Sequence, residues 1–67
     1  METLKIARQK KGLTRLELGE LVGVEANYIY LLETGRRSNP TKRLIEKLAL
    51  ALDLSPVEIF VGFEKSA

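Results

Sequence analysis

Apolar residues recur along the chain at the three- and four-residue intervals of α-helices. No segment alternates between apolar and polar residues, and both prolines fall at junctions, which argues against a sheet. The first helical run covers residues 3–11, with Leu4 and Ala7 on one side. Gly12 ends this run, and Leu13 turns inward. The pattern therefore predicts an all-α protein.

The next helix is predicted to begin after Thr14. Thr14 and Glu17 form the pattern T-x-x-E of a capping box, in which each residue satisfies a free backbone N–H at the start of a helix. An apolar stripe follows at helical spacing, formed by Leu18, Leu21 and Val22. Gly19 interrupts this helix, although a glycine in an exposed helix costs about 1 kcal/mol relative to alanine. We expect Gly19 to let the following helix cross close by; a tolerated glycine or a frayed helix is the alternative.

A third helix is predicted over residues 26–33, after a turn at Gly23, where a positive φ angle is easiest to accommodate. Ile29 and Leu32 mark its buried side. Two short helices joined by such a turn, here over about residues 14–34, form a helix-turn-helix. This motif presents its second helix to a groove of DNA.

Two more helices are predicted after a turn at residues 38–40. Thr41 can cap the fourth helix, and Ser55 and Pro56 suit the N-cap and first position of a short fifth helix. The fourth helix has a broad apolar stripe of Leu44, Ile45, Leu48, Ala49 and Leu52. The fifth helix is assigned the apolar residues Val57, Phe60 and Val61. We expect five helices packed as a single domain over residues 1–67.

Composition limits the classes of function. The chain is 45% hydrophobic and 30% charged, which is typical of a globular domain. It has no cysteine and no histidine, which removes disulfides, thiolate metal sites and the commonest general base. We therefore expect no catalytic residue, no cofactor and no metal, and a protein that is not an enzyme.

Targeting signals are also missing from the sequence. No apolar run approaches the roughly 20 residues of a membrane span, and the first twelve residues lack a signal-peptide core. The expected location is the cytoplasm. A chain of this length buries only about 60% of its unfolded surface, so oligomerisation would be a natural source of additional stability.

The net charge is only +2, but the charges are segregated along the chain. Residues 13–33 are acidic, whereas residues 1–12 and 36–47 are basic. The second basic segment contains Arg36, Arg37, Lys42, Arg43 and Lys47. Lys and Arg supply the sequence-independent part of DNA affinity, so this segment is a candidate phosphate-binding surface. An ordinary solvated face is the alternative.

Taken together, these motifs resemble the phage-repressor and Cro-like (XRE-like) helix-turn-helix family. The resemblance covers the chain from Leu4 to Phe60 and implies a compact, five-helix, lambda-repressor-like domain. The matching motifs are Leu4-x-x-Ala7-Arg8, Lys11-Gly12-Leu13-Thr14, Glu17-Leu18, Leu21-x-Gly23-Val24, Tyr28-Ile29-x-x-Leu32-Glu33-x-Gly35, Asn39-Pro40 and Leu48-Ala49-x-Ala51-Leu52. The family implies a transcriptional regulator that binds double-stranded DNA in the cytoplasm, in association with the nucleoid.

The resemblance also implies which residues meet DNA. The helix from Ala26 is the expected recognition helix, and Asn27 is the clearest base reader because its amide can bond adenine N6 and N7 together. Ala26 and Leu31 offer apolar contact, for example with a thymine methyl group. Tyr28 either reaches a base or a phosphate or packs in the core. Tyr30 is expected to be mainly exposed and to touch the DNA backbone.

The remaining implied contacts involve charge. Glu25, near the N-cap of the recognition helix, can accept a hydrogen bond from cytosine N4 or cap the helix. At the position of Arg15 the family commonly has glutamine, and arginine can hold a phosphate at least as well or read a guanine. The expected phosphate contacts are the side chains of Arg15, Arg36, Arg37, Lys42 and Arg43 and the backbone amides of Thr14 and Asn39. Arg8 and Glu33 match a family pair that forms an internal salt bridge.

A single recognition helix covers few base pairs, so we expect a homodimer on a roughly palindromic operator, with two helices about 34 Å apart. The segment over about residues 56–64 is the expected dimer surface. Its contact residues are Ile59, Val61 and Phe63, while Phe60 is assigned to the core of each copy. Past Gly62 the chain is expected to pair as a short extended segment. Two alternatives remain, namely a monomer whose tail folds back, and an antitoxin or adaptor that binds mainly protein on the same scaffold.

Overall fold

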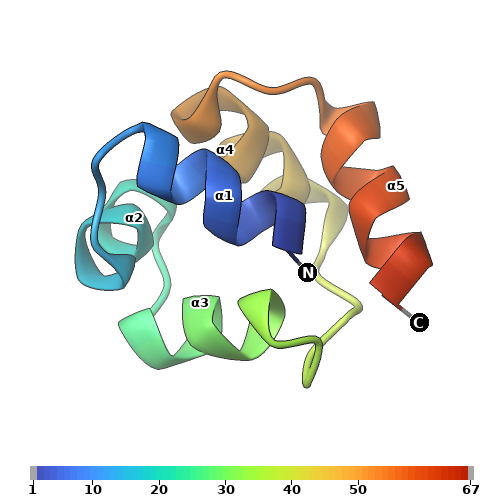
Figure 1. Ribbon diagram of the computed structural model, residues 1–67, viewed down its shortest axis with the longest axis horizontal. Helices are drawn as coiled ribbons and strands as arrows, with labels where there is room; N and C mark the ends of the chain where they lie inside the picture. Colours follow the sequence, from blue (N-terminus) through green and yellow to red (C-terminus); the bar gives the residue numbers. More distant parts are fainter. Residues whose placement is uncertain (1, 67) are drawn as a thin grey trace.

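The computed structural model describes the backbone of residues 2–66 and the side chains of residues 2–63. It contains five helices in the order α1 (Glu2–Lys10), α2 (Arg15–Val22), α3 (Ala26–Glu33), α4 (Lys42–Leu52) and α5 (Pro56–Ser66) (Figure 1). There is no strand within residues 2–66, so the predicted all-α, five-helix fold is confirmed. Within the same residues, no helix combines the length and the apolar character needed to cross a membrane.

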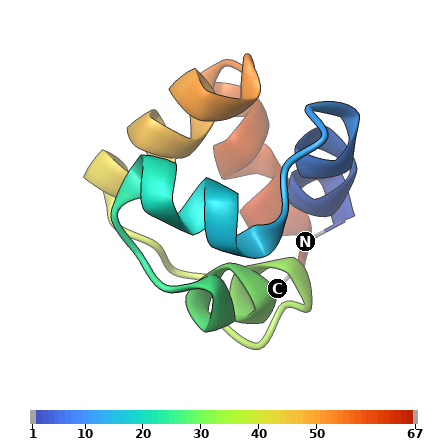
Figure 2. The same ribbon diagram turned by 90° about the vertical axis from the view of Figure 1, so that its left-hand side faces the viewer.

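The helices are arranged around a shared interior. α2 packs against α3 and α4, α1 packs against α3 and α5, and α4 packs against α5. In Figure 1, α3 runs along the lower edge of the molecule and α5 forms the right-hand side. Figure 2 shows α2 in front, directly above α3. Helix α3, the expected recognition helix, therefore lies at one edge of the described part of the chain.

All five helices contribute to the core. Its buried apolar residues are Leu4, Leu18, Val22, Ile29, Leu32, Leu44, Leu48, Ala49, Leu52, Ile59 and Phe63, and Ala7, Leu13 and Ile45 pack at its margin. Leu21, which was predicted to lie on the buried stripe of α2, is instead 61% exposed, so that prediction is wrong. Leu21 directly precedes the buried Val22 and therefore points in a different direction from it. The 8-residue helix α2 buries only a narrow stripe of side chains.

The fifth helix differs from its prediction. It continues to Ser66, so the expected extended segment past Gly62 is wrong. Phe60, which was assigned to the core, is 52% exposed, whereas Ile59 and Phe63 are buried. Because α5 stays helical, Ile59 and Phe63 are four residues apart on one face, and Phe60 is turned about one quarter of the way around the helix from Ile59.

Side-chain caps fix the starts of three helices. Thr14 Oγ1 accepts from Glu17 N–H at 3.0 Å, and Glu17 Oε1 accepts from Thr14 N–H at 2.9 Å, which confirms the capping box of α2. Thr41 Oγ1 accepts from Leu44 N–H at 3.1 Å at the start of α4. Ser55 caps α5 as predicted, and Glu58 completes a second reciprocal pair with Ser55. The sequence S-x-x-E carried the signal for this second box.

The turn between α2 and α3 is held by backbone contacts at two glycines. Gly23 has a φ angle of 82°, and its N–H donates to Gly19 O at 2.7 Å. A side chain at Gly19 would collide with the carbonyl oxygen of Val24, and it would also lie 3.3 Å from the carbonyl carbon of Glu25. Gly19 is therefore required by the close approach of the turn to α2, as expected from its place in the sequence.

Candidate nucleic-acid interface

Helix α3, the expected recognition helix, has a buried side and an uncovered side. Ile29, Leu32 and Glu33 are buried, whereas Asn27 and Tyr30 are exposed. Residues that are three or four positions apart share one face of a helix. Asn27 therefore lies on the same outer face as Tyr30 and the half-buried Leu31, and the half-buried Ala26 stands at its start.

A buried ion pair anchors the inner side of α3 to α1. Arg8 Nε donates to Glu33 Oε2 at 2.6 Å, and only 9% of the Arg8 side chain and 1% of the Glu33 side chain are exposed. Arg8 Nη1 also donates to Leu13 O at 2.7 Å, which ties the α1–α2 connection to the same group. The predicted structural pair of Arg8 and Glu33 is confirmed.

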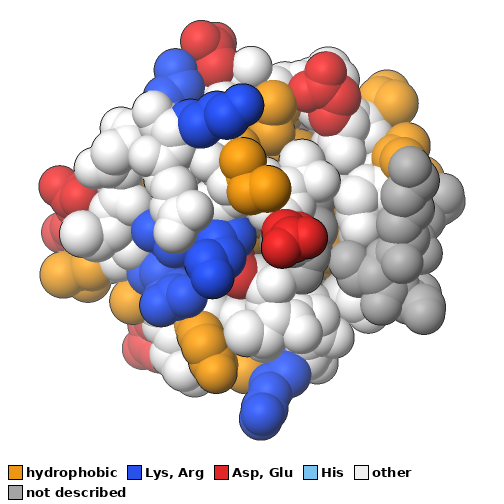
Figure 3. All heavy atoms as spheres, in the orientation of Figure 1, with side chains coloured by type: hydrophobic (Ala, Val, Ile, Leu, Met, Phe, Trp, Pro, Cys, Tyr) orange, Lys and Arg blue, Asp and Glu red, His pale blue; other side chains and the backbone are white. Residues whose placement is uncertain are grey.

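The same carboxylate binds a second arginine that the sequence did not connect to it. Arg15 Nε donates to Glu33 Oε1 at 2.9 Å, and the Arg15 guanidinium lies over the Tyr30 ring, with Cζ 5.1 Å from the ring centre. In Figure 3 the largest group of Lys and Arg side chains on the visible face lies where α2 and α3 meet. Arg15 is thus placed beside the outer face of α3, where its contact with a phosphate remains a prediction.

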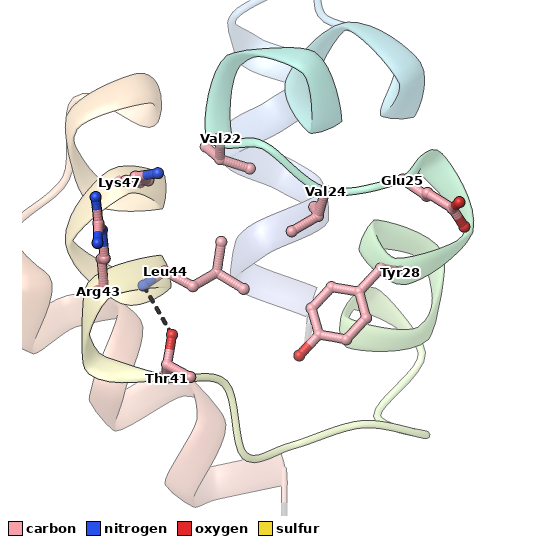
Figure 4. Close-up of a pocket in the computed structure, with 8 residues that line it drawn as sticks. All are labelled: Val22, Val24, Glu25, Tyr28, Thr41, Arg43, Leu44 and Lys47. Carbon is pink, nitrogen blue, oxygen red and sulfur yellow. Dashed lines mark hydrogen bonds between the residues drawn. The ribbon is translucent and has the colours of Figure 1, made fainter.

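Tyr28 lies on the other flank of α3. Its half-buried ring packs against the core, in agreement with the core alternative. It also lines a groove of about 450 Å³ between the start of α3 and the first turns of α4, and Arg43 and Lys47 border the α4 side (Figure 4). The Tyr28 hydroxyl points toward the open groove, below Leu44. Core packing and a DNA contact at this hydroxyl are therefore compatible.

The structure does not support two of the roles that were predicted for residues at helix starts. The Thr14 amide donates to Glu17, so its proposed role as a phosphate donor is not supported. Glu25 occupies the N-cap position of α3 with extended backbone angles, but its side chain accepts no capping hydrogen bond. The capping alternative for the Glu25 carboxylate is therefore wrong. In Figure 4 this carboxylate points away from the groove, and its contact with cytosine remains a prediction.

The basic residues of the turn after α3 are all exposed. Arg36, Arg37 and Asn39 lie in the connection to α4, and Lys42 and Arg43 begin α4. Arg37 N–H donates to Leu31 O at 3.0 Å, which holds this turn against the end of α3. The turn therefore places its positive charges next to the recognition helix.

Of the three expected dimer residues, two are buried within the single chain and one is exposed. Ile59 and Phe63 are 0% and 4% exposed within the single chain, so they are not available to a partner, which corrects their assignment. Val61 is 37% exposed and remains a candidate contact. Val57, which is 68% exposed, was not among the expected contacts, because a helix with apolar residues on both sides does not show which side is buried.

Comparison with known proteins identifies the family. A helix-turn-helix family profile matches residues 4–59. The HTH-type transcriptional regulator SinR of Bacillus subtilis is 33% identical over 54 residues, covering 81% of this chain and 49% of SinR. An uncharacterized HTH-type transcriptional regulator of Sinorhizobium fredii, y4dJ, is 44% identical over 52 residues, covering 78% of this chain and 66% of that protein.

The chain spans about half the length of the SinR proteins that it matches. No solved structure gives a significant match. The family match covers most of the chain and includes α2, the Gly23 turn and α3, whose geometry is that of the motif itself. The chain therefore belongs to the XRE-type helix-turn-helix family.

Proposed function

We propose that this chain binds double-stranded DNA sequence-specifically as part of a transcriptional regulator. The observation that carries the proposal is the outer face of α3, which is uncovered and has positive charge on both flanks. Arg15 lies beside Tyr30 on one flank, and Arg43 borders the Tyr28 groove on the other. A helix in the major groove needs this arrangement, because phosphates border the groove on both sides.

The relatives support the regulatory part of the proposal. Both are named as HTH-type transcriptional regulators. The family profile, which matches residues 4–59, covers α2, α3 and most of the core. In this proposal Asn27 reads a base, and Arg36, Arg37 and Arg43 hold phosphates, with the Asn39 amide as a further donor. Lys42, which lines the groove between α4 and α5, is assigned to the contact between the two copies. Ala26 and Leu31 supply apolar contact at the groove floor.

We further propose that two copies bind a roughly palindromic operator. The contact surface consists of the outward residues of α5, Val57, Phe60 and Val61, which are 68%, 52% and 37% exposed. Phe60 and Val57 also line a mainly apolar groove of about 440 Å³ against α4. An exposed apolar patch beside a groove can meet the same patch of a second copy across a two-fold axis.

Charge on the rim of this groove favours a second copy as the occupant. Lys42 and Glu46 line the groove together and carry opposite charges. A two-fold axis through the surface can bring Lys42 of each copy to Glu46 of the other, so the rim is complementary to itself. Because α5 forms one side of the molecule and α3 the lower edge in Figure 1, copies joined side by side can present both α3 helices in the same direction.

A protein-binding module on the same scaffold is the second candidate. Leu16 and Leu21 on α2 are each 61% exposed, so α2 offers apolar area that DNA binding does not use. An antitoxin or adaptor would use such an area for a protein partner. The two candidates differ in whether folded protein alone selects a DNA sequence.

The deciding experiment is selection of bound sequences from random double-stranded DNA with the purified chain. We expect enrichment of one motif, with two related half-sites about one helical turn apart. A parallel selection with the Arg36→Ala, Arg43→Ala variant, shown to be folded by circular dichroism, should recover the motif poorly. If the folded parent enriches no sequence and its retention of DNA does not depend on salt, the proposal fails in favour of the protein-binding candidate.

A further inference from the structure

The guanidinium group of Arg15 is held on two sides and open on a third. Glu33 Oε1 accepts from its Nε at 2.9 Å, and the Tyr30 ring covers one of its faces at 5.1 Å. The terminal nitrogens Nη1 and Nη2 donate to none of the described residues. The side chain remains 38% exposed. Arg15 is therefore fixed in orientation while its distal edge is open to solvent.

This open edge has the geometry that recognises phosphate. The two terminal nitrogens of an arginine can donate parallel hydrogen bonds to two oxygens of one phosphate group. Arg15 is also the first residue of α2, where the helix dipole favours an anion. A phosphate at this place would meet the guanidinium donors of Arg15 at the positive end of that dipole.

Local charge allows this contact. The Glu33 carboxylate is shared by Arg8 and Arg15, so one negative charge faces two positive ones. Glu33 is buried and its charge is turned toward the interior, whereas Arg15 reaches the surface. The positive charge of Arg15 is therefore the part of this cluster that an anion at the surface can reach.

We propose that Tyr30 and Glu33 are positioning residues that hold Arg15 ready to bind a backbone phosphate of DNA. Tyr30 thus acts through Arg15 and not through its own contact with DNA. An arginine that is already immobilised loses less conformational entropy on binding than a free one. The inference rests on the proposed DNA-binding function, because Tyr30 shares the outer face of α3 with Asn27.

A double-mutant cycle tests the coupling. Fluorescence anisotropy would measure the affinity of the parent, Arg15→Ala, Tyr30→Ala and the double variant for a labelled duplex carrying the selected motif and for a scrambled duplex. Loss of the ring contact should weaken binding about two- to fivefold in the parent background. In the Arg15→Ala background the same change should have no further effect. Tyr30→Phe, which keeps the ring, should bind as the parent does.

The salt dependence tests the ligand. Arg15→Ala should lower the log–log slope by about 0.9 on both duplexes, because one phosphate contact is lost. Lys10→Ala is the matched control, since Lys10 lines a pocket with Leu52 and Leu54 at the end of α4, and its removal should leave the slope unchanged. Thermal melting of each variant verifies that it is folded.

Three results would overturn the inference. Equal losses from Tyr30→Ala with and without Arg15 would show that Tyr30 does not act through Arg15. A loss confined to the selected duplex in Arg15→Ala would mean that Arg15 reads a base. A folded parent that binds neither duplex would overturn the DNA-binding function itself, whereas additive losses in a parent that binds overturn only the positioning role.

Discussion

Glu33 on α3 and Arg8 on α1 form a buried ion pair whose atoms Oε2 and Nε are 2.6 Å apart. This pair joins the first helix of the chain to the recognition helix. Removing one partner leaves a charge buried without compensation, which typically costs roughly 3–5 kcal/mol. The orientation of α3 therefore depends on a residue outside the helix-turn-helix.

The first prediction follows from this pair. Glu33→Ala should lower the midpoint of thermal unfolding by more than about 10 °C, because about 1 kcal/mol corresponds to roughly 4–8 °C in a domain of this size. Circular dichroism measures the change. Lys11→Ala, which removes an exposed pair with Asp53, is the control and should cost no more than about 1 kcal/mol. An unchanged midpoint in Glu33→Ala would contradict the structural role of the pair.

The second prediction concerns Gly19. Alanine normally favours a helix interior over glycine by about 1 kcal/mol, yet Gly19→Ala should be destabilising here because its methyl group meets the Val24 carbonyl oxygen. Overpacking of this kind costs typically about 1–3 kcal/mol. Urea denaturation measures whether this substitution lowers or raises the free energy of unfolding. Glu20→Ala, at an exposed position of the same helix, should leave stability nearly unchanged, and a stabilised Gly19→Ala would show that the turn can move.

The third prediction concerns base reading by Asn27. Asn27→Ala should reduce discrimination by about 1–3 kcal/mol at one base pair, because the paired hydrogen bonds to that base are lost. The measurement is the affinity ratio between the selected duplex and single-base variants of it. If the variant keeps the parental ratio at every position, Asn27 is not a reader.

The fourth prediction concerns the basic turn. Arg36→Ala should weaken binding to selected and scrambled duplexes equally and lower the log–log salt slope by about one unit. Titrations at several salt concentrations measure this slope, with Lys10→Ala as the charge-matched control. A loss limited to the selected duplex would assign Arg36 to a base and not to a phosphate.

The fifth prediction concerns assembly. The parent should dimerise at high micromolar concentration, and the Val57→Glu, Phe60→Glu variant should remain monomeric, because it places charges on the apolar surface of α5. Sedimentation equilibrium measures both states. Leu50→Glu is the control, since Leu50 is 86% exposed on α4 and does not line the α5 groove. A parent that is monomeric under these conditions would rule out a preformed dimer.

Local signals in the sequence predicted most of the fold. Helical periodicity located the core, and the cap residues Thr14, Thr41 and Ser55 located three helix starts, because capping involves residues only three positions apart. The Gly19 signal was also local in sequence. Its cause is a contact with the turn that follows within a few residues.

The incorrect predictions have physical causes in packing between distant segments. α5 has apolar residues on both sides, so its pattern could not show that Ile59 is buried and Phe60 exposed. Arg15 meets Glu33 across 18 positions of sequence, and no periodic pattern encodes such a pair. The pair of Arg8 and Glu33 came from the family resemblance alone, for the same reason.

One side of α3 is anchored by buried residues and the other is uncovered, so side chains on the uncovered side can change independently of the fold. Asn27 and Leu31 can be exchanged for other side chains without touching the buried residues that hold the helix in place. Under the proposed function, one unchanged scaffold could therefore acquire a new target sequence through very few substitutions. The Glu33 carboxylate has no such freedom, because the position of the whole helix and the orientation of Arg15 both depend on it.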